Sequence, residues 1–266
     1  VIAGGGGGNT SDDVAHGAGG AGGYLCNVNG ENSGGNTSAQ PSLFVPKSTN
    51  LQVTVGAGGG TASPGSKSEF TSIMSVGGGE GNRDFNKCGS SGGPNGRTSG
   101  GPTSGFTNNI AGQGSASGDG VALQGAGGAG GAGAAGADGT NNQGGAGGAG
   151  LASSITGSSV TRGGGGGGGG TTGGAGGSGG GGAGGSGNNA NGTSGTANTG
   201  GGGGGSGILT GGTPGSGGSG TVILRWATAD ATIGATRTGL TDGDVQTDGS
   251  DSYIVFTAGA GTVSFS

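Results

Sequence analysis

Few residues of this chain have the chemistry of a catalytic site. The single histidine, His16, follows two acids, Asp12 and Asp13, in a stretch rich in glycine. Histidine beside carboxylates is typical of general acid–base catalysis, but that chemistry also needs a pocket that positions a substrate. A glycine loop does not supply one, so we expect His16 to lie in a solvated turn, and we expect neither enzymatic activity nor a cofactor.

Motifs built from glycine and serine carry little information here, because 87 of the 266 residues are glycine. Matches to Gly-x-Ser-x-Gly or Gly-x-Gly-x-x-Gly arise by chance against this background. None has the strand, the helix and the distant acid that give such a motif its meaning. No Gly-Lys-Ser or Gly-Lys-Thr phosphate loop occurs.

The two cysteines, Cys26 and Cys88, lie far apart in the sequence and have no cysteine or histidine at metal-ligand spacing. This pattern favours a disulfide in an oxidising compartment over a zinc site. Two buried free thiols are the alternative.

Four aspartates near the end of the chain could supply oxygen ligands to calcium. Their spacing matches neither an EF-hand nor a glycine-rich calcium repeat, so we expect turn-forming aspartates and no metal site. These residues are Asp242, Asp244, Asp248 and Asp251.

The elements that hold the chain together must differ from those of an ordinary domain, because only 26% of the residues are hydrophobic and 3% are aromatic. Collagen is excluded, since it needs a strict Gly-X-Y repeat and many more than the six prolines present. Disorder is the alternative that composition leaves open. If the octaglycine 163–170 is ordered, nearly all of its N–H and C=O groups must be paired, because glycine loses more backbone freedom on ordering than any other residue.

The net charge of −5 and a pI near 4.5 leave no basic stripe for a phosphate backbone, so we expect no nucleic-acid partner. No apolar run approaches 18 residues, and we expect no membrane insertion. The chain begins without Met and ends in text typical of a strand, from which we expect excision from a longer polypeptide.

Composition divides the chain into three segments. Residues 1–124 mix glycine blocks with strand-like text such as Leu51–Val55, which alternates apolar and polar residues. Residues 125–220 are almost entirely Gly, Ala, Ser, Thr and Asn. Residues 221–266 return to strand-like text and form a third, small β element.

In the middle segment glycine recurs at every third position. Three residues is the period of the polyproline II conformation, which makes no internal hydrogen bonds. In its all-glycine form, polyglycine II, such helices lie side by side and bond to one another. We expect a mainly β and irregular fold with essentially no α-helix: a polyglycine II bundle flanked by short antiparallel strands. A stack of glycine-rich strands is the competing interpretation.

The last segment predicts one buried strand followed by a hairpin. Residues 220–226 have the apolar sequence of a buried strand. Residues 253–257 and 262–266 predict two further strands, joined by a turn at Ala258–Gly261.

The order of these features resembles the glycine-rich domain of bacteriophage tail-fibre and adhesin proteins. The resemblance rests on Val1-Ile-Ala-Gly-Gly-Gly-Gly-Gly8, on Gln52-Val-Thr-Val-Gly-Ala-Gly58, on the glycine blocks and on Gly217-Gly-Ser-Gly-Thr-Val-Ile-Leu-Arg225. It covers about residues 1–226 and implies an extracellular or virion location.

In similar phage chains, text like 253–265 precedes the opening Val-Ile-Ala-Gly, whereas here it comes at the end. This suggests a fibre in which the C-terminal hairpin of one unit pairs with the first strand of the next, so that the chain's partners are copies of itself. The expected junction residues are Val1, Ile2, Tyr253, Ile254, Phe256, Val263 and Phe265.

Two alternatives to a fibre subunit follow from the same features. A receptor-binding adhesin at a fibre tip would bind a cell-surface receptor or glycan through loops between the rods. Its expected contact residues are Tyr24, Arg83, Phe85, Arg97 and Phe106. An ice-binding protein, like the glycine-rich antifreeze proteins of springtails, would need a flat face of small residues at period three, for which Ala126, Ala129 and Ala132 have the spacing.

Overall fold

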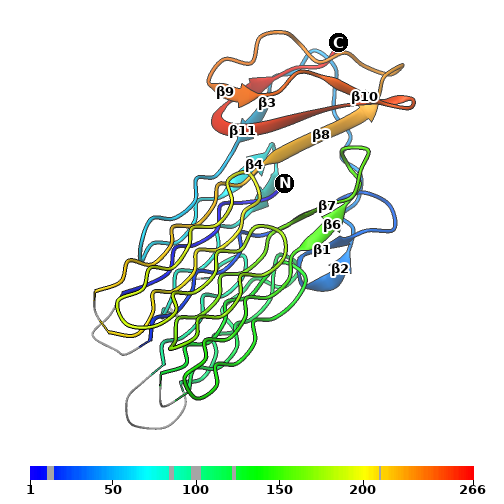
Figure 1. Cartoon of the computed structure of the whole chain (residues 1–266). Helices are drawn as coiled ribbons and strands as arrows, with labels where there is room; N and C mark the ends of the chain where they lie inside the picture. The colour runs from blue at the N-terminus through cyan, green and yellow to red at the C-terminus, as the bar shows by residue number, and fades with distance from the viewer. Residues whose placement is uncertain (11–14, 84–86, 97–102, 122–123, 210) are drawn as a thin grey trace.

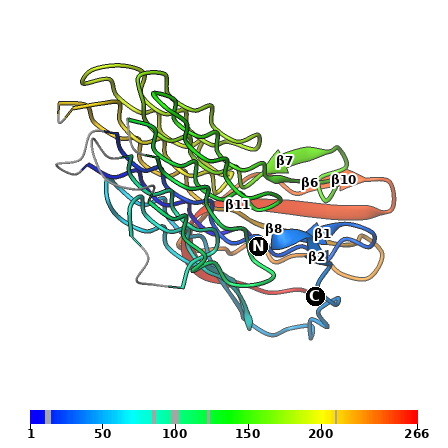
Figure 2. The ribbon, with the colours of Figure 1, turned by 90° about the horizontal axis from the view of Figure 1, so that it is seen from below.

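A computed structural model describes residues 1–10, 15–83, 87–96, 103–121, 124–209 and 211–266. The chain forms a bundle of extended glycine-rich rods with a β-sheet cap at one end (Figure 1). In the view from below, the rods lie toward one side, and β8 and β11 extend from behind them toward the other (Figure 2). The described residues contain no α-helix, only a single 3-10 turn, Gly34–Asn36. The fold is mainly β and irregular, as the composition predicts.

The octaglycine 163–170 lies inside the bundle and is completely paired. All eight residues are buried. Each of the eight N–H groups donates to a carbonyl elsewhere in the chain, and each of the eight C=O groups accepts a bond. This pairing offsets the large entropic cost of ordering glycine.

The bonding of the octaglycine repeats every three residues. Gly164, Gly167 and Gly170 all donate to the rod 179–185, at 3.1, 2.9 and 3.3 Å. The residues between them donate to other neighbours, so the bonds leave the rod in three directions. A β-strand would bond in two opposite directions, whereas three-fold bonding is the pattern of polyglycine II. Among the described residues the run bonds to the rods 16–19, 126–132, 145–148, 174–177, 179–185 and 202–205.

Rods on both sides of the expected boundary at residue 124 belong to the same bundle. The first rod, 2–9, repeats the pattern of the octaglycine: its N–H groups donate in rotation to the segments 17–23, 63–66 and 215–221. Its carbonyls accept from further neighbours, including 78–81. The glycine lattice therefore extends across the first 220 residues.

Glycine is required in the rods because neighbouring backbones leave no room for a Cβ atom. At Gly166 a Cβ would overlap the carbonyl oxygen of Gly203, and at Gly167 it would overlap that of Gly174. Small side chains occur inside the bundle only where the lattice leaves room. Ala126, Ala129 and Ala132 are of this kind and are fully buried, so these three alanines form no exposed ice-binding face.

The rods continue directly into strands where residues with side chains replace glycine. The main sheet has the order β10-β11-β3-β4-β5, with β8 and β9 also paired to β11. Its strands are β3 (Leu51–Thr54), β4 (Ser68–Phe70), β5 (Ile73–Ser75), β8 (Val222–Ala227), β9 (Leu240–Asp242), β10 (Gln246–Asp248) and β11 (Asp251–Val263). Two small antiparallel pairs lie beside the bundle: β1 (Asn32–Ser33) with β2 (Thr37–Ser38), and β6 (Leu151–Ser153) with β7 (Val160–Arg162).

The expected C-terminal hairpin is wrong, because residues 251–263 form one strand. β11 runs for 13 residues and changes partners along its length: β8 and β10 at its start, β9 in its middle and β3 at its end. Gly259 sits within it at a φ of 95°, a conformation that favours glycine. The Ala-Gly sequence at 258–261, which resembles a turn, is instead part of an irregular but continuous strand.

The cap holds the largest cluster of buried side chains. It brings together residues that are far apart in the sequence, and Val53, Val222, Ile254 and Phe256 are completely buried. The cap therefore has a conventional apolar core, while the bundle depends on backbone hydrogen bonds.

Two alanine substitutions separate the roles of glycine. We expect Gly166→Ala to lower the free energy of unfolding by at least about 2 kcal/mol, because its Cβ meets backbone atoms and a neighbouring alanine in a closed lattice. Gly60→Ala is the control, since a Cβ there meets nothing within 4 Å. We expect that variant to match the wild type within about 1 kcal/mol. Urea unfolding measures both, and equal midpoints for the two variants would contradict the close-packed lattice.

Candidate functional site: a pocket between bundle and cap

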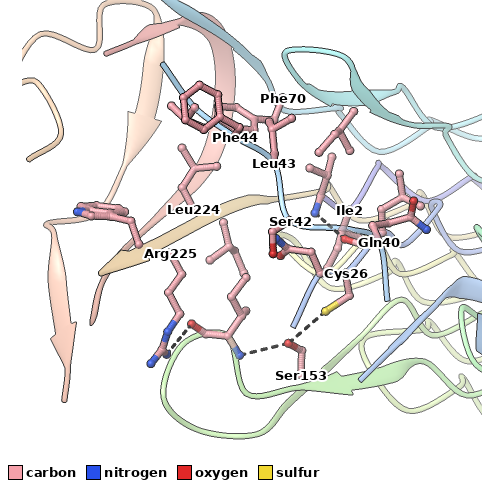
Figure 3. Close-up of a pocket in the computed structure, with 18 of the residues that line it drawn as sticks. Ile2, Cys26, Gln40, Ser42, Leu43, Phe44, Phe70, Ser153, Leu224 and Arg225 are labelled. Atoms are coloured by element: carbon pink, nitrogen blue, oxygen red, sulfur yellow. Dashed lines mark hydrogen bonds between the residues drawn. The ribbon is translucent and has the colours of Figure 1, made fainter. Parts of the chain in front are cut away.

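A pocket of about 650 Å³ lies where the bundle meets the cap. Its walls come from the first rod, from the segment 40–47, from β8 and from the end of the chain. This volume is in the range of pockets that hold small molecules. The close-up shows the apolar side chains of Leu43, Phe44 and Phe70 near one another, with Cys26 and Ser153 on the opposite side (Figure 3).

Apolar residues make up one wall of the pocket. Leu224 and Phe70 belong to the core of the cap and face the pocket as well. Phe44 is 86% exposed and Leu43 is 37% exposed, so the segment that carries them holds two large apolar side chains in contact with water. Scattered apolar residues are common on surfaces, but two beside an apolar pocket indicate a surface that a ligand could cover.

Trp226, the single tryptophan, also lines the pocket. Its indole N–H donates to the carbonyl of Ala231 at 2.9 Å. Its ring packs edge-on against Phe265, with centroids 5.2 Å apart and planes at 75°. The ring is thus held in place, and its fluorescence will report on the pocket.

The opposite wall carries polar groups. The thiol of Cys26 donates to the Glu31 carboxylate at 3.4 Å and lies 3.9 Å from the Ser153 hydroxyl. Glu31 also accepts from the N–H and the hydroxyl of Ser154, at 2.8 and 2.6 Å. Tyr24, only 2% exposed, completes this wall.

Burial controls the ionisation of this wall. It raises the pKa of the Cys26 thiol and raises the pKa of Tyr24 well above its ordinary range, so both groups are neutral near pH 7. Burial would also raise the pKa of Glu31, but hydrogen bonds from Ser153 and Ser154 outweigh it, and that pKa is lowered.

The positive charge of Arg225 is balanced by two ion pairs. It donates to Asp251 at 2.8 Å, to Asp248 at 2.9 Å and to the carbonyl of Ile155 at 3.2 Å. The bonds to the two aspartates raise its pKa. These aspartates therefore serve as ion-pair partners.

Asp242 pairs with Arg237 in the same way. No group of three metal-ligating side chains occurs among the residues that the structure describes.

Arg162, at the end of β7, differs from Arg225. It is half-buried, and among the described residues no carboxylate forms an ion pair with it. Its Nη1 atom is buried and has no hydrogen-bond acceptor. Burial lowers its pKa, although electrostatic interaction with Tyr24 raises it in part. Arg162, Lys47 and Asp230 all line the pocket without an ion pair among the described residues, and of these three only Arg162 has a buried nitrogen without an acceptor.

The structure corrects the expectation for His16. It is not in a solvated turn but is fully buried in the bundle, where its Nδ1 lies 2.9 Å from the carbonyl of Gly207 and 2.8 Å from the hydroxyl of Ser206. A neighbouring rod about 190 residues later in the sequence supplies these partners, which is why the local sequence did not reveal them. Asp12 and Asp13 lie outside the described residues.

The two cysteines do not form the expected disulfide; they are the two buried free thiols of the alternative interpretation. Cys26 and Cys88 are both free and buried. The sulfur of Cys26 faces Glu31 and Ser153, while that of Cys88 donates to the Asn108 side chain at 3.4 Å. The two belong to separate surroundings, so no bridge forms between them.

The described members of the expected receptor-contact set differ in exposure. Tyr24 is buried in the pocket wall and is not available to a receptor, which corrects that expectation. Arg83 is exposed and pairs with Glu80 at 3.2 Å, and Phe106 is half-buried. Phe85 and Arg97 lie outside the described residues.

The expected junction residues have partners within their own chain. Ile2 pairs with both Thr221 and Tyr24, and Phe265 pairs with Ile233. Of the set, Ile2, Ile254, Phe256, Val263 and Phe265 are buried, while Val1 and Tyr253 are half-buried. Pairing with another copy through these strands would require the contacts seen here to open.

Sequence reasoning missed the pocket itself. Two signals were present: the apolar run Leu43-Phe44-Val45 in a polar segment, and a lone cation, Arg162, directly before the octaglycine. Neither indicates a site until the fold brings the two segments together.

In a comparison with protein families, the model of a glycine-rich domain matches residues 1–227. Neither a curated protein nor a solved structure matches the chain. The matched region contains the whole bundle and the first part of the cap.

The described residues also include no helix with the length and hydropathy needed to cross a bilayer.

The thiols give a test of the pocket wall. Protein purified without reductant should yield two reactive thiols per chain in denaturant, because both cysteines are free. In the native Cys88→Ser variant, Cys26 should react with a disulfide reagent far more slowly than an exposed thiol. Since burial raises its pKa, the thiolate fraction at pH 8 is small, and the rate should keep rising above the pH at which an ordinary thiol levels off. No reactive thiols in denaturant would show a disulfide instead.

Proposed function

The chain belongs to the family of glycine-rich domains, and from that premise we propose that it is a non-enzymatic structural module of an extracellular or virion fibre. The observation that carries the proposal is the complete backbone pairing of the octaglycine. A glycine-rich segment used as a flexible linker would leave these groups to water.

Hydrogen bonding of each rod to neighbours in three directions supports a mechanical role. Each rod is tied to several others by backbone bonds, so a force on one rod is shared among its neighbours. Each bond contributes only about 1 kcal/mol net, but together they must open for a rod to be pulled out. Only 8% of the residues are charged, so there is little electrostatic repulsion between the rods of the bundle.

The fibre proposal includes association with copies of the same chain. The terminal strands already have partners, so association must either exchange these strands or use other surfaces. Strand exchange between identical units is a common route to closed or open assemblies.

Hydrogen exchange tests the rigid body. We expect the amides of 163–170 to exchange as slowly as those of the buried residues Val222–Leu224 of β8, because both segments are buried and paired. Exchange of these glycine amides at the rate of an unstructured chain would show a flexible linker and overturn the proposal. The exposed residues Ser158 and Ser159 are the internal control, and their amides should exchange fast.

Electron microscopy tests the fibre. Negative-stain images of the purified chain at increasing concentration should show filaments or end-to-end oligomers. Sedimentation velocity on the same samples should show a matching rise in mass. Monomers at every concentration would contradict self-association and favour the second candidate.

That second candidate is an adhesin, in which the bundle carries binding loops. One observation favours it: turns from distant parts of the sequence meet at the end of the bundle away from the cap (Figure 1). Thr171 bonds to Gln124 across 47 residues, and Asn189 accepts from the N–H of Gly211. A rigid scaffold with loops gathered at one end is a common arrangement for recognition.

Two matched variants test the adhesin. Arg83 and Lys67 are both exposed cations that pair with a glutamate. Arg83 follows the turn at residues 81–82, at the end of the rod that leaves β5, whereas Lys67 directly precedes β4. If the far end binds cells, Arg83→Ala should weaken binding of labelled protein severalfold while Lys67→Ala leaves it unchanged. Equal binding by both variants would remove Arg83 from the contact set.

A further inference from the structure

The pocket between bundle and cap has no role in a purely mechanical module, yet its size and lining are those of a ligand site. We propose that it binds an organic anion with an apolar body, the anionic group beside Arg162 and the apolar body against Leu43, Phe44 and Leu224. The class includes medium-chain carboxylates and similar amphiphiles.

The charge distribution indicates an anion. Arg225 is satisfied by two aspartates, so it has no need of a further acceptor. Arg162 lines the same pocket without an ion pair among the described residues, and one of its nitrogens is buried without an acceptor. A desolvated guanidinium of this kind is costly, and a carboxylate is its best geometric and electrostatic partner.

The apolar wall indicates the rest of the ligand. Phe44 and Leu43 are exposed at the pocket, next to Leu224 and Phe70 (Figure 3). An alkyl or aromatic body placed there would remove this surface from water, which favours binding in proportion to the apolar area covered. On the wall beside it, Cys26 and Tyr24 are neutral near pH 7. The charged carboxylate of Glu31 does not line the pocket, and it accepts hydrogen bonds from the Cys26 thiol and from Ser154.

The second pocket offers weaker evidence for a ligand site. The second pocket, near Cys88, has a volume of about 280 Å³ and is lined by Lys87, Arg83 and Glu80, of which the last two pair with each other. It has no apolar wall comparable to that formed by Leu43 and Phe44.

The test compares decanoate with 1-decanol, which has the same chain length and no charge. Calorimetry and the fluorescence of Trp226 measure the binding of each to the full chain. We expect saturable one-to-one binding of decanoate, at least about tenfold tighter than that of decanol. Equal affinities, or no saturable binding of decanoate, would overturn the proposal.

Three variants locate the site. Arg162→Met keeps most of the side-chain volume and should abolish the preference for decanoate over decanol. Arg83→Met is the same change outside this pocket and should leave the preference intact. Phe44→Ser alters a side chain that is 86% exposed, so the fold should tolerate it, and it should weaken both ligands severalfold.

The outcomes remain decisive if Arg162→Met proves unstable. Weaker decanoate binding by Phe44→Ser supports the pocket independently of that variant. If Phe44→Ser changes the oligomeric state and leaves decanoate binding unaltered, the exposed apolar residues serve contact between copies, and the ligand proposal is wrong. Fibre formation and the bundle's slow exchange do not depend on either result.

Discussion

The hydrogen-bonding demand of a bare backbone is the constraint on which the rest of this structure depends. A run of eight glycines has no side chain to bury, so an ordered conformation is possible only if every N–H and C=O finds a partner. The octaglycine meets that demand by bonding in three directions at a period of three residues. The absence of Cβ atoms is what lets the rods approach closely enough, and a Cβ at Gly166 or Gly167 would overlap a neighbouring carbonyl.

The cap follows from the same constraint. Where valine, isoleucine and phenylalanine replace glycine, the chain can no longer fit a close-packed lattice of rods, and the same segment continues as a β-strand with an apolar core. The rod ending at residue 220 becomes β8, and β5 leads into the rod that begins at residue 76. The pocket lies at this change of packing, because the side chains of the cap cannot interdigitate with a surface made of backbone.

The sequence allowed the principle of the bundle to be predicted but not its extent. The three-residue period and the octaglycine predict backbone-bonded rods, and the strand-like text at Leu51–Thr54 and Val222–Ala227 marks two strands of the cap. The predicted hairpin was wrong because the sequence around Gly259 resembles a turn. Pairing with β9 and β3 instead holds this part of the chain in a strand. His16 was misplaced for a similar reason, since its partners are about 190 residues away. The pocket depends on contacts between distant segments, which composition and period do not specify.

The most direct test of the central claim is the measurement by NMR of scalar couplings across the hydrogen bonds of 163–170. The account predicts that the amides of Gly164, Gly167 and Gly170 couple to carbonyls of the rod 179–185, and that the intervening amides couple to other rods. Couplings that alternate between two neighbours at a period of two residues would show a β-sheet, and their absence would show an unpaired chain. Either result would contradict a polyglycine II lattice.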